Sequence, residues 1–87
     1  MLESKIEKAL IARVKTLDGT CEKFVSPGRR GVPDRLVTLP GGRIIFVELK
    51  SPSGRLSQSQ IHDHERRIQM GCDVRVINNI EAIDAFP

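Results

Sequence analysis

The chain has 87 residues, of which 39% are hydrophobic and 29% are charged, and its formal net charge is +3. This length suits one small domain with a core near the lower limit for independent stability, and no apolar run is long enough to span a membrane. The absence of Trp and Tyr argues against base stacking on aromatic platforms, whereas the mildly basic balance is compatible with a polyanionic partner.

The first predicted element is a helix from Glu3 to Leu17. Its apolar residues recur at helical spacing: Ile6, Leu10, Val14 and Leu17. At about 100° per residue, Glu3 projects closer to the centre of this apolar stripe than Glu7 does, so Glu3 is the acid expected to point inward. An acid at a helix start can also serve only the helix dipole.

A β-strand is predicted from Thr20 to Val25, because this run is rich in β-forming residues. The loop that follows, from Ser26 to Gly31, carries the adjacent guanidinium groups of Arg29 and Arg30. These could bind phosphates bidentately and position a nucleic-acid backbone, although a solvated basic loop would contain the same residues. Arg55, in a later turn-rich stretch, is a third candidate for phosphate contact.

Two β-rich runs, Asp34 to Leu39 and Arg43 to Lys50, flank the tripeptide Pro40-Gly41-Gly42. This pattern predicts an antiparallel hairpin. We favour a loop of all three residues, because Gly42 suits the left-handed last position of that loop.

The hairpin register decides which side chains meet. With the three-residue loop, Leu39 faces Arg43 and Asp34 faces Glu48, so that Asp34, Glu48 and Lys50 share one face. A two-residue loop would shift the register by one and place the two acids on opposite faces. The hydrophobic pattern excludes neither choice.

The favoured register brings together groups with a recognisable chemistry. Two carboxylates, with a backbone carbonyl and waters, are the hard oxygen ligands that Mg²⁺ prefers, and a nearby ammonium can orient an attacking water or help to deprotonate it. The arrangement predicts phosphodiester hydrolysis. The same residues also have a structural explanation, with Asp34 as a turn residue after Pro33 and with Glu48 and Lys50 as strand charges that guard a sheet edge.

A second helix is predicted to begin at Ser57 and to continue to Met70. Ser57 and Gln60 have the spacing of a capping box, which explains this pattern without catalysis. His62 and His64 do not predict a metal site, because residues two apart on a helix do not face together.

A further strand, Cys72 to Ile77, is expected to pair in parallel beside the hairpin after the helical crossover. Asn79 then caps a short last helix, Ile80 to Phe86, whose apolar face could bury against the sheet or a second subunit. The predicted fold is therefore α/β, in the order αβββαβα, with a mixed central sheet that holds the site at one edge. Cys21 and Cys72 have no metal-binding spacing and are expected to be reduced.

Three blocks of this sequence are Gly31-Val32-Pro33-Asp34, Phe46-Val47-Glu48-Leu49-Lys50 and Gly54-Arg55-Leu56-Ser57-Gln58-Ser59-Gln60. In order and spacing they resemble the virus-type replication-repair nuclease (VRR-NUC) family of the PD-(D/E)XK nuclease superfamily. The resemblance runs from the first helix nearly to the end of the chain. It implies a restriction-endonuclease-like core and one nuclease domain over residues 1–87. It also implies that Asp34 and Glu48 of the hairpin are catalytic residues.

The resemblance also implies roles for two residues outside the hairpin. Related enzymes place a Glu of the first helix beside the metal site, and Glu3 matches it best, with Glu7 as the reserve. A Gln at the place of Gln60 lies near the catalytic centre, where it would contact a water, Lys50 or the scissile phosphate. One amide does not easily serve this role and the helix cap together.

The hypothesis that follows is metal-dependent cleavage of DNA. Asp34, Glu48 and the backbone carbonyl of Leu49 would hold Mg²⁺ or Mn²⁺, and Lys50 would orient the attacking water. Similar stand-alone domains imply branched DNA such as four-way (Holliday) junctions as the substrate, and a homodimer would present two sites to it. The expected compartment is the cytoplasm of a bacterium or a virus-infected host cell, without a membrane partner. The alternatives are a nuclease or nickase without junction selectivity, and a non-catalytic nucleic-acid-binding module.

Overall fold

The computed structural model covers residues 1–87 and has the element order αβββαβα. The elements are α1 (Glu3–Thr16), β1 (Thr20–Lys23), β2 (Arg35–Leu39), β3 (Arg43–Leu49), α2 (Gln58–Gln69), β4 (Asp73–Ile77) and α3 (Ile80–Asp84). The predicted α/β class and element order are confirmed, and the predicted ends differ from the observed ends by at most two residues. No helix combines the length and apolar character that crossing a membrane requires.

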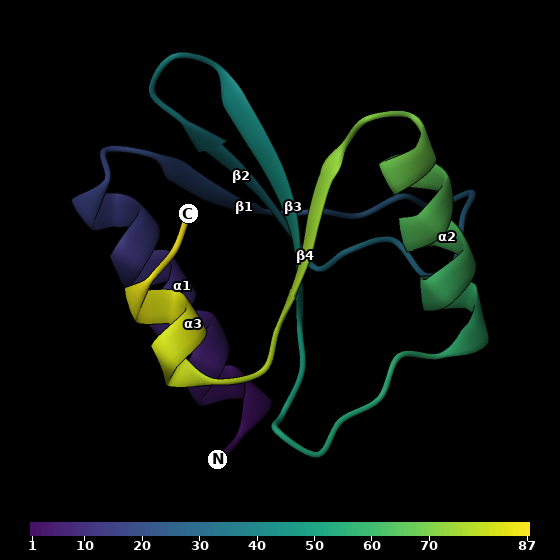
Figure 1. Cartoon of the computed structure of the whole chain (residues 1–87), viewed down its shortest axis with the longest axis horizontal. Helices are drawn as coiled ribbons and strands as arrows, with labels where there is room; N and C mark the ends of the chain where they lie inside the picture. Colours follow the sequence, from purple (N-terminus) through teal and green to yellow (C-terminus); the bar gives the residue numbers. More distant parts are fainter.

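The four strands form one mixed sheet in the order β1-β2-β3-β4 (Figure 1). Strands β1, β2 and β3 are antiparallel neighbours, and β4 joins β3 in parallel after the crossover through α2. Leu39 pairs with Arg43, which confirms the three-residue loop. Gly41 and Gly42 have φ angles of +89° and +81°, a left-handed conformation that glycine adopts at little cost.

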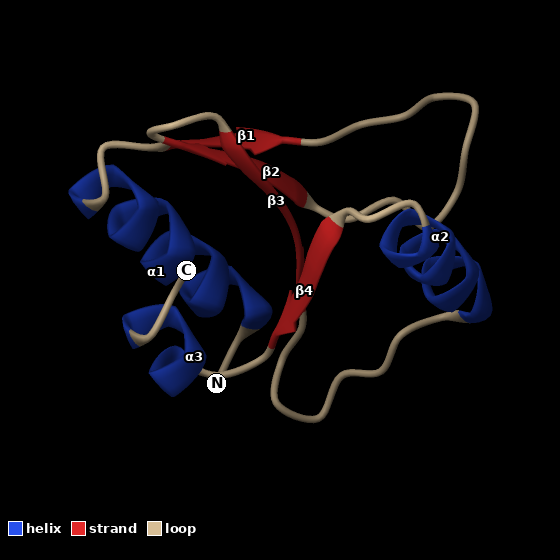
Figure 2. Ribbon diagram, turned by 45° about the horizontal axis from the view of Figure 1, so that its top comes forward, coloured by secondary structure: helices blue, strands red, loops and turns tan.

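Helices α1 and α3 lie side by side on one face of the sheet, and α2 lies on the opposite face (Figure 2). The apolar stripe of α1 packs on the inward side chains of β2 and β3 to form the main core. Its members are Ile6, Leu10, Val14, Val37, Leu39, Ile45, Val47, Leu49, Ile77, Ile83 and Phe86. The apolar residues of the last helical segment therefore bury within their own chain.

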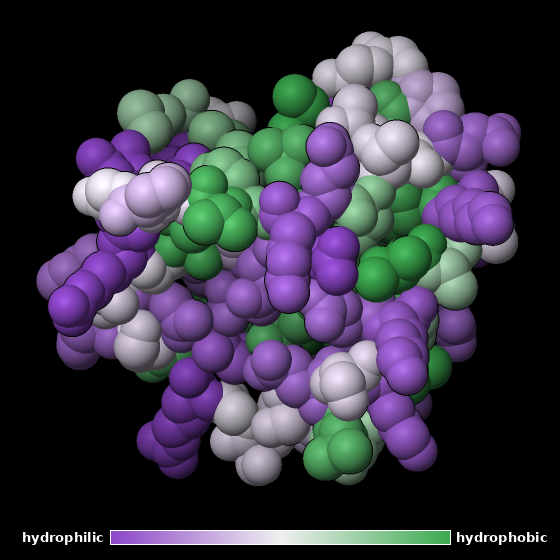
Figure 3. Space-filling model, turned by 180° about the vertical axis from the view of Figure 1, so that it is seen from behind, coloured by the Kyte–Doolittle hydropathy of each residue, from purple (hydrophilic) through white to green (hydrophobic).

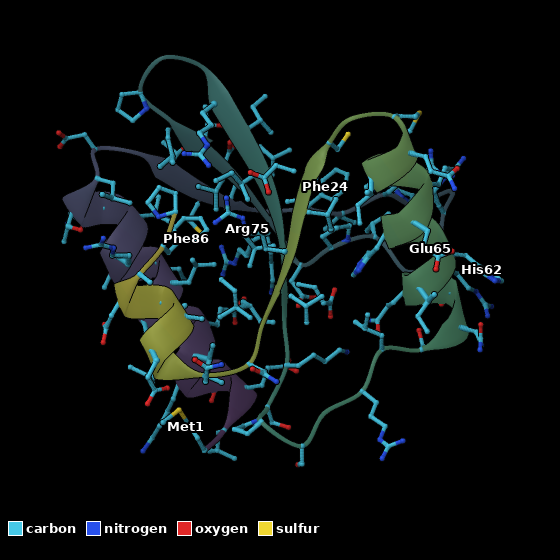
Figure 4. The ribbon with its side chains drawn as sticks, viewed as in Figure 1. Met1, Phe24, His62, Glu65, Arg75 and Phe86 are labelled. Carbon is cyan, nitrogen blue, oxygen red and sulfur yellow. The ribbon has the colours of Figure 1, made fainter.

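The opposite face attaches α2 through a mixed aromatic and charged cluster. The guanidinium carbon of Arg67 lies 5.2 Å from the ring centroid of Phe24 and 4.8 Å from that of Phe46, which are cation–π distances. Figure 4 shows Phe24 on the side of the sheet that faces α2. The Nε of Arg67 also donates to Asp63 at 2.7 Å. Burial opposes ionisation of Asp63, but Arg67 and Arg66 together hold the pKa of its carboxyl below the usual value.

Candidate active site

Asp34 and Glu48 meet where β2 begins and β3 ends. The Oδ2 atom of Asp34 accepts a hydrogen bond from the backbone N–H of Leu49 at 2.9 Å, and its carbonyl oxygen accepts one from Phe24 at 2.9 Å. Asp34 is therefore hydrogen-bonded both to the last residue of β3 and to the residue that follows β1. The site lies at one end of the two central strands and not at an outer edge of the sheet as expected, because β1 and β4 flank the hairpin on both sides.

The carboxyl group of Glu48 is held in an environment that disfavours its charge. Its residue is only 1% exposed. Burial, together with the negative charge of Asp34 beside it, raises the pKa of Glu48 to about 7, although Lys50 acts in the opposite sense. Two adjacent carboxyl groups in a dry setting gain from a bound cation, which would offset their mutual repulsion.

Lys50 and Gln60 both contact the same oxygen of Glu48. The Nζ of Lys50 lies 3.2 Å from Oε2, and the Nε2 of Gln60 donates to Oε2 at 3.1 Å. Lys50 follows β3, whereas Gln60 lies in the first turn of α2. The structure thus brings Asp34, Glu48, Lys50 and Gln60 together.

Gln60 uses the two ends of its amide for two purposes. While Nε2 donates to Glu48, Oε1 accepts a hydrogen bond from the backbone N–H of Ser57 at 2.9 Å, and the Ser57 hydroxyl accepts one from Gln60 N at 3.2 Å. The predicted capping box is present. The expectation that one amide does not easily serve the cap and the site together is wrong, because the cap needs only its oxygen and the site only its nitrogen.

Sequence reasoning missed His64 as part of this constellation. The residue is 4% exposed, and its Nε2 lies 3.8 Å from Oε1 of Glu48. Burial lowers the pKa of His64. The signal was present in its spacing from Gln60, because residues four apart share a helix face. His62 instead points outward from α2 (Figure 4).

A cavity of about 250 Å³ opens beside Asp34. Its lining includes Glu3, Glu7, Asp34 and Leu49. Glu7 forms an ion pair with Arg35, in which the Nε of Arg35 lies 3.0 Å from the carboxylate of Glu7. Glu3 is exposed on the cavity wall. Glu3 is therefore the first-helix acid without a cation partner. It does not join the Asp34 and Glu48 pair directly.

The donor atoms suit a hard divalent cation. Asp34 and Glu48 offer carboxylate oxygens, Leu49 lines the same cavity as Asp34, and Oε1 of Glu48 is buried without a hydrogen-bond donor. No three side chains of the His, Cys, Asp and Glu types gather to hold a metal ion. A cation here would complete its coordination with a backbone carbonyl and waters, which is how proteins commonly hold Mg²⁺.

The three arginines expected to contact DNA are all exposed. Arg29 and Arg30 lie in the loop between β1 and β2, Arg55 lies in the loop before α2, and none of them forms an ion pair. The space-filling view shows hydrophilic side chains running across the middle of one face and separating smaller hydrophobic patches (Figure 3). Free guanidinium groups of this kind are available to phosphates.

Comparison with known proteins gives three concordant results. The profile of the VRR-NUC domain family matches residues 1–79. The chain is 46% identical over 85 residues to "Putative nuclease p44" of Acyrthosiphon pisum secondary endosymbiont phage 1, covering 98% of this chain and 91% of that protein. A solved structure titled "VRR_NUC domain" superposes with a TM-score of 0.89 at 34% identity, covering 95% of this chain and 90% of the other.

Proposed function

The chain belongs to the VRR-NUC domain family, and from this membership and the site geometry we propose that it is a metal-dependent DNA endonuclease of the PD-(D/E)XK type. The family and the phage relative support a nuclease, and therefore a nucleic-acid substrate. One observation carries the finer proposal: the hairpin sets Asp34 beside Glu48, and Lys50 lies 3.2 Å from the Glu48 carboxylate. Two carboxylates with an ammonium group beside them suit metal-assisted hydrolysis of a phosphodiester.

Asp34, Glu48 and the backbone carbonyl of Leu49 would hold Mg²⁺, with Mn²⁺ able to replace it. When bound, the cation polarises the scissile phosphate and makes a water easier to deprotonate. Two observations support a divalent cation at this site: Oε1 of Glu48 is buried without a partner, and the pKa of that carboxyl group is raised. Glu3, across the cavity, would act through water on the same site.

Lys50 has the position to serve the attacking water. Its side chain is 17% exposed, and its ammonium group is anchored at one side by Glu48, which leaves other N–H donors free for a water at the site. From there it orients the water and stabilises the negative charge that develops on the phosphate oxygens. Gln60 acts indirectly by holding the carboxylate of Glu48 in place.

We propose branched DNA, including four-way junctions, as the substrate, cut by a homodimer. A domain of this size offers little surface of its own with which to recognise a branch, and a two-fold pair would present two sites to a two-fold junction. The exposed Arg29, Arg30 and Arg55 would contact its phosphates. The phage relative supports action in the cytoplasm of a host cell.

The test is a cleavage assay on a labelled four-way junction, a flap and a matched linear duplex with Mg²⁺, Mn²⁺ or EDTA. We expect paired cuts in the junction that require both metal and Lys50, with Lys50→Ala inactive and the exposed-lysine control Lys15→Ala fully active. Light scattering at the same concentration should give the mass of a dimer. Full activity of Lys50→Ala would defeat the assignment of the site.

The remaining outcomes separate the alternatives. Equal cutting of all three substrates would indicate a nuclease or nickase without junction selectivity. Binding without any cut, indifferent to Mg²⁺ and to loss of Glu48, would indicate a non-catalytic nucleic-acid-binding module. A monomer at the concentration where junctions are cut would exclude the dimer.

A further inference from the structure

Three buried polar side-chain atoms in this molecule have no hydrogen-bond partner, and they all belong to one pair of residues. They are Oε1 of Glu48 and both ring nitrogens of His64. The two residues are 1% and 4% exposed, so bulk water does not satisfy these atoms. An unpartnered buried polar atom costs about 1–3 kcal/mol, and such atoms are rare in native proteins. Their concentration at the proposed catalytic carboxylate calls for a functional explanation.

Helix α2 presents two side chains to Glu48 from one face. Gln60 and His64 are one helical turn apart, and each is directed at a different oxygen of the carboxylate. Gln60 donates to Oε2 at 3.1 Å, and Nε2 of His64 lies 3.8 Å from Oε1. The first contact is a formed hydrogen bond, and the second is a short movement away from one.

We propose that His64 is a positioning residue that fixes Oε1 of Glu48, so that the carboxylate is oriented to bind the divalent cation. This inference rests on the proposed nuclease function. With a donor on each oxygen, the carboxylate group cannot rotate. Oε2 is already contacted by Lys50 and Gln60, so Oε1 is the oxygen that keeps a lone pair for the cation. Such partners behind a metal ligand typically change metal affinity by about 10–100-fold when they are removed.

His64 acts through Glu48 and does not hold the metal itself. The ring is almost fully buried beneath α2, and His64 does not gather with Asp34 and Glu48 into a group of three metal-ligating side chains. A purely structural role would predict a well-packed residue with satisfied nitrogens, whereas both nitrogens of His64 lack partners. The positioning role therefore makes a specific claim: the donor on residue 64 matters more than its volume.

The experiment compares two substitutions at this position. His64→Leu keeps a buried side chain of similar size but removes the donor, and His64→Gln keeps a donor at similar reach. Mn²⁺ binding is measured on the full chain by the electron paramagnetic resonance signal of free Mn²⁺, and thermal unfolding is followed without metal. His62→Leu is the matched control, because His62 is exposed on the same helix.

We expect His64→Leu to bind Mn²⁺ at least about tenfold more weakly than the wild type, with an unfolding temperature that is not lowered. His64→Gln should stay within about threefold of the wild type, and His62→Leu should be unchanged. Wild-type affinity in His64→Leu would overturn the inference alone, as would His64→Gln binding as weakly as His64→Leu. A wild-type protein that binds no Mn²⁺ would overturn the proposed metal dependence and this inference with it.

Discussion

Gly31 packs directly against the backbone of Ser59 in the first turn of α2. A Cβ atom at residue 31 would overlap the Ser59 carbonyl group and lie 2.7 Å from the Gln60 nitrogen, and Gly31 has a φ of +79°. The arginine-bearing loop can therefore approach α2 only because residue 31 has no side chain. The loop thus packs against the same helical turn that carries Gln60, whose amide donates to Glu48.

Gly31→Ala is expected to destabilise the protein by about 3 kcal/mol or more, because left-handed strain and overpacking act together. Two glycines separate these causes. Gly41→Ala, at φ +89° in open space, should cost about 1–2 kcal/mol, and Gly28→Ala, in open space without positive φ, should cost almost nothing. Denaturant unfolding gives the free energy of unfolding of each of the three variants. Equal costs for Gly31→Ala and Gly41→Ala would show that the contact with Ser59 is unimportant.

Replacing Glu48 with Gln should change how stability depends on pH. The folded-state pKa of Glu48 is raised from 4.5 to about 7, so the folded protein binds this proton more tightly than the unfolded chain does. The contribution of this proton to the free energy of unfolding is therefore fully present below pH 4.5 and is lost as the pH rises to about 7. Relative to the wild type, metal-free Glu48→Gln should gain on the order of 3 kcal/mol across that range.

Unfolding at several pH values with EDTA measures this difference, because titrations shared by both proteins cancel. Added Mn²⁺ should restabilise the wild type and leave Glu48→Gln unaffected. A difference between the two proteins that does not vary with pH would contradict a raised pKa at Glu48.

Substitutions of the two acids of α1, Glu3 and Glu7, should affect different properties of the protein. Glu7→Gln removes the partner of Arg35, a residue whose side chain is 15% exposed, and should destabilise the fold by about 1 kcal/mol. Glu3→Gln touches no ion pair, so it should cost only about 0.5 kcal/mol through the helix dipole and should raise the Mn²⁺ concentration needed for half-maximal cleavage. Thermal unfolding and a metal titration of cleavage distinguish the two. The assignment of Glu3 fails if only Glu7→Gln alters the metal requirement.

Arg29, Arg30 and Arg55 should each contribute to the salt dependence of DNA binding. If each contacts one phosphate, its replacement by Ala should reduce the slope of log K against log salt by about 1. Arg43→Ala is the control, because Arg43 lies beside the loop at the far end of the hairpin and faces Asp73 at 3.7 Å. Fluorescence anisotropy with Ca²⁺ in place of Mg²⁺ gives the slopes. An unchanged slope removes that arginine from the interface.

The local patterns of the sequence predicted most of the fold. Helical periodicity identified α1, the paired β-rich runs and Gly42 identified the hairpin with its register, and Ser57 with Gln60 identified the start of α2. These succeeded because each depends on residues close together in the chain. The predicted ends of β1 and α3 each lie two residues beyond the observed ends, because pairing and packing with distant segments decide where these elements stop.

The parts of the site that depend on packing between elements were not predictable in the same way. Whether Glu3 or Glu7 remains free is decided by Arg35, which comes from a different element and pairs with Glu7. The contact of His64 with Glu48 requires α2 to lie at a particular distance from β3, which Gly31 and the Arg67 cluster set. Spacing along one helix could nominate His64, but only the packed structure shows what it faces.

The amide of Gln60 joins the beginning of α2 to the carboxylate of Glu48. When the first turn of α2 frays, the cap at Ser57 and the contact to Glu48 are lost in the same event. On the proposed function, the folded population would then divide into molecules with the site assembled, which can cut, and molecules without it, in a ratio set by the opening free energy of that one turn. Solution conditions that stabilise short helices would raise the fraction of active molecules without changing any group that touches DNA.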